Sequence, residues 1–340
     1  MNRIKGFTVV ELLISLAVGL GLLAGVLSVF VGMKTTTSET SSFGELQENG
    51  RFALNLLTHD LLRQDFWGDY TGTFDLSSLN GVVQAAPTND CVGQGINNAT
   101  FPVAAGHFRT LWGITVDSSN TNPLGCFANA NPAKEDSDIV QIKRVLGDPV
   151  LLADVDDERY YLMTNIGHGE IFDGGGATPP TIDNSQIWEY QHHIYYVTEQ
   201  SQGSDKVPVL MQGRLTDSMV FSPVVDGIEM IRFMYGVDTS GNGMVNSYIS
   251  ADEMNNNPDY WDNAATSATA SVTSSIIAVK IYVLARSVLP DNKYSNTNTY
   301  HLGNLEYTVD DNYRRLLFSA TVTLFNARID SWPPQNLPAI

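Results

Sequence analysis

The first 67 residues change hydrophobic pattern midway and predict one long helix with two different halves. Between Leu12 and Met33 no side chain is charged, and this run is long enough to cross about 30 Å of hydrocarbon as a helix. Beyond Lys34 the apolar residues recur at helical spacing, with polar residues largely on the opposite face. The apolar stripe contains Phe43, Leu46, Gly50, Ala53, Leu54, Leu57 and Leu61; the polar face contains Gln47, Glu48, Arg51, Asn55, His59 and Asp60. We therefore expect a helix from Phe7 to about Arg63 whose second half packs on the protein's own sheet.

Two segments are expected to interrupt or end this helix. Thr35 to Ser42 is a weakly polar stretch in which the helix can loosen. The glycine of Phe66-Trp67-Gly68 is expected to stop it.

The rest of the chain predicts strands and long loops. Residues 68–135 are rich in Gly, Asn, Thr, Ser and Pro, which favours loops and short strands. Clearer strands, several of them alternating apolar and polar residues, are expected at 139–145, 194–197, 209–211, 230–235, 276–284 and 316–325. This alternation is typical of an antiparallel sheet with one covered face. Flexible insertions are expected at 174–176, 201–204 and 264–275.

The predicted fold class is α+β, with a long N-terminal helix packed on an antiparallel sheet that carries long surface loops. The expected divisions are a leader at 1–6, a membrane-spanning and assembly helix at 7–33, its amphipathic continuation at 34–67, and a globular domain at 68–340.

Charge excludes one class of partner. The net charge of the 340-residue chain is −18, and loss of Arg3 and Lys5 with the leader would make it −20 (−18 − 2). Nucleic-acid binding needs clustered Lys and Arg to displace counterions, and no basic patch interleaved with aromatic residues occurs in the sequence. Direct binding of nucleic acid is therefore not expected.

The chain contains two cysteines, Cys91 and Cys126, both in loop-like sequence. With the basic leader held in the cytoplasm, the rest of the chain faces an oxidising exterior. We expect a disulfide between them, which would stabilise the domain by a few kcal/mol. The alternative is two unrelated thiols.

The N-terminus places a short basic leader in front of the apolar run. Arg3 and Lys5 precede Gly6, and Glu11 stands alone at the edge of the uncharged segment. A carboxylate in that place is expensive in lipid and is usually functional. An ordinary secretory signal is cut after its apolar stretch, whereas the expected cut here lies before it, between Gly6 and Phe7.

Cleavage there would give Phe7 a free α-amino group and keep the apolar helix on the mature protein. Glu11 can pair with such an amine on a neighbouring helix, because two desolvated charges that satisfy each other cost less than either alone. This pairing favours side-by-side packing in staggered register and is a polymerisation device. The alternative is a signal anchor whose Glu11 reaches the membrane interface.

Residues 6–13, Gly-Phe-Thr-Val-Val-Glu-Leu-Leu, resemble the N-terminal signature of type IV pilins and pseudopilins. Further segments are similar to the PilW family of minor pilins: 46–53 with 61–68, 226–238 and 318–326. Proteins of that family commonly carry a glycine before the final aromatic pair of the helix, where this chain has Asp65.

The resemblance implies that a prepilin peptidase removes residues 1–6 and N-methylates Phe7, and that Glu11 acts in assembly. It implies a single-pass protein of the bacterial inner membrane with a periplasmic domain, found on the pilus and cell surface after assembly. As a minor pilin it would prime type IV pilus assembly, form part of the tip complex, and support twitching motility and adhesion. The implied partners are other minor pilins, the major pilin, the prepilin peptidase, the inner-membrane assembly platform and a large tip adhesin.

A second candidate site begins at Asp238. Oxygen side chains at Asp238, Ser240 and Asn242, a following glycine, and the backbone carbonyl of Met244 match the first half of a calcium loop. The twelfth position is Ile249, which cannot supply the bidentate carboxylate, although Asp252 or Glu253 could fold back to do so. Two of the three side-chain ligands are neutral, so binding would be weak. The alternative, and the one we favour, is a glycine-rich hairpin turn that uses Asx chemistry.

No sequence motif indicates an enzyme. The chain has no Gly-x-Ser-x-Gly elbow, no His-Glu-x-x-His, no Walker A motif and no dinucleotide fingerprint. His192 and His193 lie beside a predicted strand, so their rings are expected to point to opposite faces and cannot chelate one metal together. We expect no catalytic residue and no cofactor, unless the loop at Asp238 binds calcium weakly.

Two rival functions use the same N-terminal segment. A type II secretion pseudopilin would serve export by the same chemistry, although the length of this chain favours a pilus subunit. A signal-anchored periplasmic enzyme or binding protein would use the apolar segment only as a tether.

Overall fold

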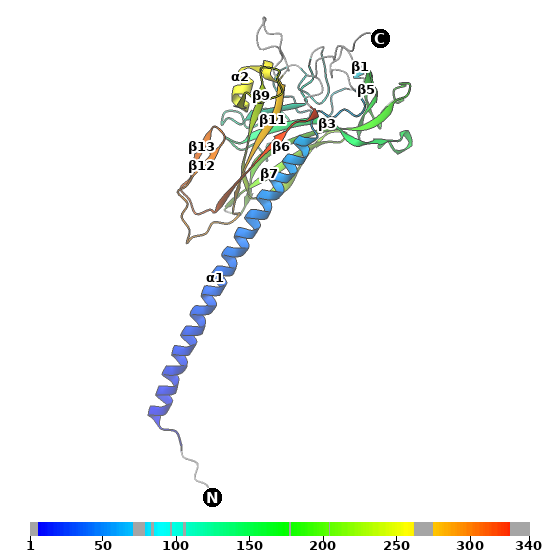
Figure 1. The fold of residues 1–340 in the computed structure, drawn as a ribbon. Helices are drawn as coiled ribbons and strands as arrows, with labels where there is room; N and C mark the ends of the chain where they lie inside the picture. Colours follow the sequence, from blue (N-terminus) through cyan, green and yellow to red (C-terminus); the bar gives the residue numbers. More distant parts are fainter. Residues whose placement is uncertain are drawn as a thin grey trace.

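A long helix projects from a β-rich domain in the computed structural model (Figure 1). The structure describes residues 6–70, 79–82, 85–95, 97–104, 107–176, 178–203, 205–261 and 275–326. The expected leader lies outside the described residues except for Gly6. The insertion expected at 264–275 lies outside them except for its last residue.

Helix α1 (Val9–Leu62) is one continuous rod of 54 residues. At 1.5 Å per residue it is about 81 Å long. Its backbone runs through residues 35–42 without a break, so the loosening expected there does not occur. That stretch contains Thr, Ser and Glu but neither Gly nor Pro, and such residues lower helix propensity only slightly.

Helix α1 ends at Leu62, six residues before the expected stop at Gly68. The chain leaves the helix direction at Asp65, whose φ of 58° lies in the left-handed region. Glycine favours this conformation, and aspartate is among the few other residues that tolerate it. The Asp65 carboxylate also accepts a hydrogen bond from Trp67 Nε1 at 2.9 Å. Aspartate can therefore replace the glycine that the resembled family carries here.

The larger sheet has eight strands and is antiparallel except for the pair β1–β5. Its path is β1-β5-β4-β6-β3-β2, and β7 pairs with β6 and β8. Its strands are β1 (Leu79–Val82), β2 (Leu111–Thr115), β3 (Asp138–Val150), β4 (Tyr160–Asn165), β5 (His168–Asp173), β6 (Gln186–Gln202), β7 (Asp205–Leu215) and β8 (Met219–Asp226).

A second, four-stranded sheet has the order β10-β9-β11-β14 and is antiparallel throughout. Its strands are β9 (Ile228–Asp238), β10 (Ser247–Ser250), β11 (Ser275–Arg286) and β14 (Arg315–Thr323). A separate hairpin consists of β12 (Thr299–Leu302) and β13 (Leu305–Thr308). The remaining regular elements are α2 (Ala251–Asn256) and the short 3-10 helices Leu152–Asp154 and Pro258–Tyr260.

The upper half of α1 is built into the core that joins both sheets. Leu46, Ala53, Leu57 and Leu61 are at most 3% exposed and belong to one apolar cluster with residues of both sheets. Most contacts of α1 are with β14 and β11. The expected apolar stripe is therefore confirmed, except that Phe43 at its lower end is 48% exposed.

The α+β prediction is confirmed, and all six expected strands occur, although most are longer than expected. The insertion expected at 201–204 is wrong for residues 201–203, because β6 and β7 pair as far as Gln202 and Asp205 and Gly203 has a φ of 65°. Ser204 lies outside the described residues. The glycines at 174–176 form a closely packed turn after β5. A Cβ at Gly174 would lie 2.0 Å from the carbonyl oxygen of Asp156.

Replacement of Gly50 by alanine is expected to weaken the docking of α1. A Cβ at this position would lie 2.1 Å from Cε2 of Phe318 on β14. Because the ring must shift, Gly50→Ala should lower the free energy of unfolding by about 1–3 kcal/mol. Chemical unfolding of the detergent-solubilised protein, followed by circular dichroism, measures the change.

Gly44→Ala on the same helix is the matched control. A Cβ there meets nothing within 4 Å, so the substitution should stabilise the helix by about 0.5–1 kcal/mol. Equal effects of the two substitutions would contradict the packing of Gly50 against Phe318.

Candidate functional site

The expected cleavage site lies in an exposed, non-helical segment at the lower end of α1. Gly6, Phe7 and Thr8 precede the first helical residue, Val9. Phe7 is 88% exposed. Proteolysis concentrates at exposed segments of this kind near a chain end. In this conformation, the bond between Gly6 and Phe7 is accessible.

Glu11 forms a capping box with Thr8 at the start of α1. The Glu11 carboxylate accepts hydrogen bonds from Thr8 N at 2.9 Å and from Thr8 Oγ1 at 3.0 Å, both on Oε2. In return, Thr8 Oγ1 accepts the Glu11 N–H at 3.3 Å. A carboxylate has about four acceptor positions, so Glu11 can keep these local bonds and still accept one from an amine on another chain.

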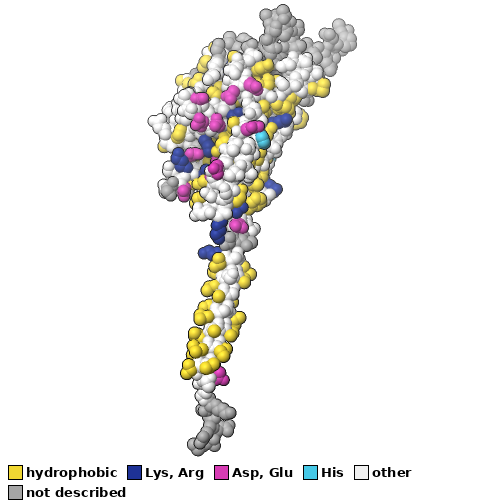
Figure 2. All heavy atoms as spheres, turned by 90° about the vertical axis from the view of Figure 1, so that its left-hand side faces the viewer, with side chains coloured by type: hydrophobic (Ala, Val, Ile, Leu, Met, Phe, Trp, Pro, Cys, Tyr) yellow, Lys and Arg dark blue, Asp and Glu magenta, His cyan; other side chains and the backbone are white. Residues whose placement is uncertain are grey.

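Every residue from Gly6 to Lys34 is exposed, so the lower half of α1 has no cover among the described residues (Figure 2). This is the part of the described chain that is long and apolar enough to cross a membrane. Gly21 and Gly25 stand one turn apart and border a shallow apolar groove with Val29 and Phe30. Small residues at this spacing let a second helix approach closely.

The upper end of α1 is tied to the larger sheet by a buried group of charges, which we call the Asp60 cluster. Arg144 Nε on β3 lies 2.8 Å from Asp60 Oδ1. On β6, His193 Nδ1 and the Tyr195 hydroxyl lie 2.6 and 2.9 Å from Asp60 Oδ2. Gln212 on β7 donates in turn to the Tyr195 hydroxyl.

The prediction that Asp60 lies on the polar face of the helix is wrong. Its side chain is 4% exposed and points inward with the apolar stripe. Asp60 stands seven residues after Ala53 and three after Leu57, which is two turns and about one turn of helix. This spacing was the signal in the sequence that Asp60 lies on the buried face. The sequence alone does not show that Arg144 and His193 lie opposite Asp60 and make its burial possible.

The electrostatics of the Asp60 cluster favour the ionised carboxylate. Burial by itself would raise the pKa of Asp60, but His193 and Arg144 outweigh it through their charges and hydrogen bonds and hold the pKa well below its ordinary value. Asp60 and Arg144 thus form a buried ion pair, and the bonds of Asp60 fix the end of α1 to β3 and β6.

The two adjacent histidines point in opposite directions, as expected. His193 faces α1, whereas His192 Nδ1 lies 2.9 Å from Thr100 Oγ1 and its Nε2 lies 3.3 Å from Gln141 Nε2. Burial, with repulsion from Lys143, lowers the pKa of His192 well below its ordinary value. The surroundings of His192 thus favour its neutral form, which is hydrogen-bonded to Thr100 and Gln141.

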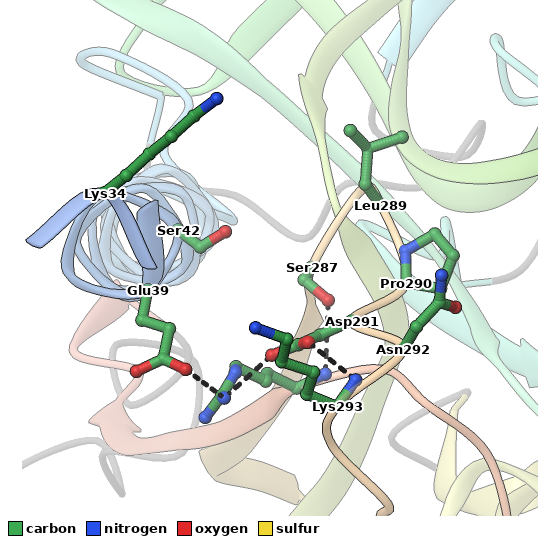
Figure 3. A pocket seen from close by; sticks show the side chains of 10 residues that line it. Lys34, Glu39, Ser42, Ser287, Leu289, Pro290, Asp291, Asn292 and Lys293 are labelled. Carbon is green, nitrogen blue, oxygen red and sulfur yellow. Dashed lines mark hydrogen bonds and ion pairs between the residues drawn. The ribbon is translucent and has the colours of Figure 1, made fainter. Parts of the chain in front are cut away.

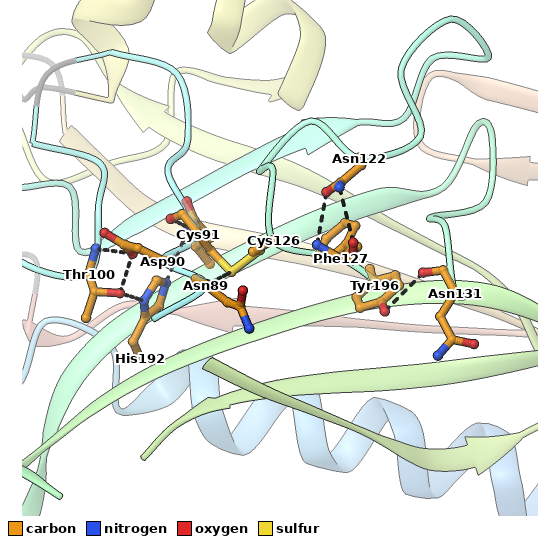
Figure 4. Close-up of a disulfide and its surroundings, with 11 residues drawn as sticks. Asn89, Asp90, Cys91, Thr100, Asn122, Cys126, Phe127, Asn131, His192 and Tyr196 are labelled. Atoms are coloured by element: carbon orange, nitrogen blue, oxygen red, sulfur yellow. Dashed lines mark hydrogen bonds between the residues drawn. A yellow bond between two sulfur atoms is a disulfide. The ribbon is translucent and has the colours of Figure 1, made fainter. Parts of the chain in front are cut away.

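The expected disulfide between Cys91 and Cys126 is present and joins two loops over β3 and β6 (Figure 4). Cys91 is fully buried, and its carbonyl accepts a hydrogen bond from Gln141 Nε2 on β3 at 3.0 Å. Next to Cys126, the Phe127 ring stacks on Tyr196 with 4.1 Å between centroids. The disulfide, with about 2–4 kcal/mol expected for a loop of this size, holds irregular chain against the sheet.

The candidate calcium residues form the turn between β9 and β10. Asp238 Oδ1 accepts the N–H groups of Ser240 at 2.9 Å and Gly241 at 2.8 Å, and Oδ2 accepts that of Gly243 at 2.6 Å. Burial would raise the pKa of Asp238, but these hydrogen bonds hold it below its ordinary value. The carboxylate thus stabilises the turn by Asx chemistry.

The other candidate ligands take part in the same turn. Asn242 Oδ1 accepts the Met244 N–H at 2.9 Å, and the Ser240 hydroxyl donates to Asp238 at 3.0 Å. Within the described ranges, no group of three or more His, Cys, Asp or Glu side chains is arranged to hold a metal ion. Asp238 Oδ1, Asp238 Oδ2 and Asn242 Oδ1 each already accept at least one N–H of the turn.

The exposed apolar half of α1 and the domain fixed to its other half fit a membrane-anchored protein. Residues 194–326, from within β6 to just beyond β14, match the family model described as Type IV Pilus-assembly protein W. This match, which covers less than half of the chain, supports a type IV pilus-related protein. No curated protein and no solved structure matches.

The matched range contains two of the segments that resemble the same family, 226–238 and 318–326. The N-terminal signature and the helical segments at 46–53 and 61–68 lie outside it.

Replacement of Asp60 by asparagine is expected to destabilise the protein by about 3–5 kcal/mol at neutral pH, because Arg144 would stay buried without its counter-charge. The pKa of Asp60 in the fold lies below the unfolded value of about 3.9. Its contribution is therefore present above that pH and is lost as the pH falls further. Denaturant unfolding of wild type and Asp60→Asn between pH 7 and pH 3 measures both effects.

Glu48→Gln on the exposed face of α1 removes an equivalent charge outside the cluster and should change stability little at either pH. The Asp60 cluster would be refuted if Asp60→Asn were no more destabilising than Glu48→Gln. It would also be refuted if the free energy of unfolding of both variants depended on pH in the same way between pH 7 and pH 3.

Calcium is expected to leave the melting temperature of the protein unchanged relative to excess chelator, because Ile249 stands where a calcium loop carries its bidentate carboxylate and two of the three side-chain ligands are neutral. Differential scanning fluorimetry of the detergent-solubilised chain measures this. A rise in melting temperature with calcium that Asp238→Asn abolishes would instead establish a calcium site.

Proposed function

We propose that this chain is a prepilin that becomes a minor subunit of a type IV pilus. In this role it helps to prime pilus assembly and forms part of the tip complex, and so supports twitching motility and adhesion. The observation that carries the proposal is the division of α1 into an exposed apolar half and a half buried in the domain. The match of residues 194–326 to the pilus-assembly family supports it.

Processing is the first step of the proposed mechanism. A prepilin peptidase would cut between Gly6 and Phe7 and methylate the new amino group of Phe7. The exposed, non-helical chain before Val9 supports this step, since a peptidase must reach the bond that it cuts. The apolar half of α1 would store the subunit in the inner membrane, with the domain in the periplasm.

Assembly is the second step, and it assigns Glu11 its role. In lipid, the Glu11 carboxylate needs a partner beyond its capping bonds with Thr8 to offset the cost of burying a charge. The amino group of Phe7 on a neighbouring subunit supplies that charge and fixes the stagger of the two helices. The groove beside Gly21 and Gly25 would admit the neighbouring helix.

The proposed partners follow from this mechanism. Other minor pilins and the major pilin would pack along α1, and the inner-membrane assembly platform would lift the subunit out of the membrane. The globular domain would contact the remaining tip components, including a large adhesin. The proposal assigns the chain no catalytic reaction, no cofactor and no contact with nucleic acid.

Gly6→Ala is expected to block removal of the leader, because the peptidase must accommodate the residue before the cut. The uncleaved chain would stay in the membrane, and surface pili and twitching would be lost or strongly reduced. Intact-mass analysis of the membrane-extracted protein reads out leader loss and methylation together.

Glu11→Ala separates processing from assembly. It should leave cleavage at Gly6 intact but reduce incorporation into pili, since the Phe7 amine of a neighbour would lack its carboxylate. Thr8→Ala is the matched control, because it removes one side of the capping box and keeps the Glu11 charge.

A Gly6→Ala protein that is processed and assembled normally would refute the proposal. If loss of the protein abolished exoprotein secretion and left pili intact, the chain would instead be a type II secretion pseudopilin.

A further inference from the structure

A pocket of about 430 Å³ lies where α1 passes the segment that follows β11 (Figure 3). On the helix it is lined by Lys34, Glu39 and Ser42. On the domain it is lined by Ser287, by residues 289–293 and by Arg314. None of the sites described above includes these residues.

The position of the pocket along α1 is set by Lys34. Lys34 is the first charged residue after the uncharged run that ends at Met33. When that run spans the hydrocarbon, the pocket stands at the level of the lipid headgroups. Leu289, on its rim, is 68% exposed. An apolar side chain and nearby lysines at this level are typical of a surface that touches a bilayer.

Positive side chains lie close together where the exposed apolar half of α1 meets the globular domain (Figure 2). The pocket is lined by three cations, Lys34, Lys293 and Arg314, and by two carboxylates, Glu39 and Asp291. The net charge of the chain is −18, so this local excess of positive charge is opposite in sign to the charge of the chain as a whole.

The carboxylates of the pocket are already engaged by one of its cations. Arg314 Nη2 lies 2.9 Å from Asp291 Oδ2 and 3.8 Å from Glu39 Oε1. The guanidinium also stacks over the Tyr294 ring, 4.4 Å from its centroid. Arg314 is thus held in place by protein groups. Within the described part of the chain, the ammonium groups of Lys34 and Lys293 have no ion-pair partner.

We propose that this pocket binds the phosphate of an anionic phospholipid headgroup while α1 spans the membrane. Lys34 and Lys293 supply the charge, and Leu289 enters the interface beside it. The bound lipid holds the base of the domain against the membrane until the subunit is lifted into the filament. The inference rests on the membrane-anchored state in the proposed function and adds a ligand to it.

Hydrogen exchange of the full chain in lipid nanodiscs tests the proposal. In discs containing phosphatidylglycerol, the amides of residues 287–293 should exchange about fivefold more slowly than in discs of phosphatidylcholine, the factor expected for about one cation near a charged lipid surface. The double variant Lys34→Gln/Lys293→Gln should lose this difference. High salt should reduce it, because the attraction is screened.

The double variant Arg51→Gln/Arg214→Gln is the matched control. It removes the same charge from exposed positions farther from the membrane and should keep the lipid-dependent protection. Equal protection of residues 287–293 in both lipids would overturn lipid binding in the pocket. So would an equal loss of the lipid-dependent protection in both double variants. So would protection that inorganic phosphate alone reproduces in phosphatidylcholine discs, since that result indicates a site for free anions. A chain that does not enter nanodiscs at all would overturn the membrane anchoring itself, which separates the two failures.

Discussion

The structure depends on the burial of one half of a helix whose other half is bare. Val9–Met33 offers apolar side chains on all sides and gains nothing from the domain, so α1 must be held entirely by its second half. Ala53, Leu57 and Leu61 supply the apolar contact, and the Asp60 cluster adds directional bonds to β3 and β6. The apolar side chains bury most of the surface in this contact, and the three hydrogen-bond partners of the Asp60 carboxylate further restrict how α1 can lie on the sheet.

Buried charge pairs recur where elements distant in sequence meet. Arg315 on β14 lies within 2.9 Å of Glu229 on β9, and Arg232 on β9 lies 3.2 Å from Asp138 on β3. Each pair joins strands far apart in the chain, and in the second case the two strands belong to different sheets. Buried pairs contribute little net stability but are costly to break. Here they add polar contacts between β9 and two strands that lie far from it in the sequence, β14 and β3.

Much of this arrangement could be predicted from local pattern, and the failures have physical causes. Long periodic segments such as α1, β9 and β11 were predictable because their apolar spacing repeats many times. The strands β10, β12 and β13 were missed because each has only four residues, and β8 was missed because it contains Pro223, a residue unfavourable in strands. The strands β4 and β5 were also missed, although each has six residues. Asp60 was misplaced because its counter-charge Arg144 lies 84 residues away. The disulfide was predictable because only two cysteines exist, whereas the pocket beside Lys34 depends on where a distant loop lies.

The unbroken backbone of α1 couples the orientation of the domain to that of the membrane segment. Each residue of an α-helix advances the chain by about 1.5 Å and turns it by about 100°. With no hinge between Met33 and Leu46, the angular phase of the buried stripe is locked to that of Glu11 and the apolar groove. The number of residues between the apolar groove and the buried stripe therefore sets the rotation of the domain about the helix axis. That rotation decides which side of the domain faces outward when the helices of several subunits pack together.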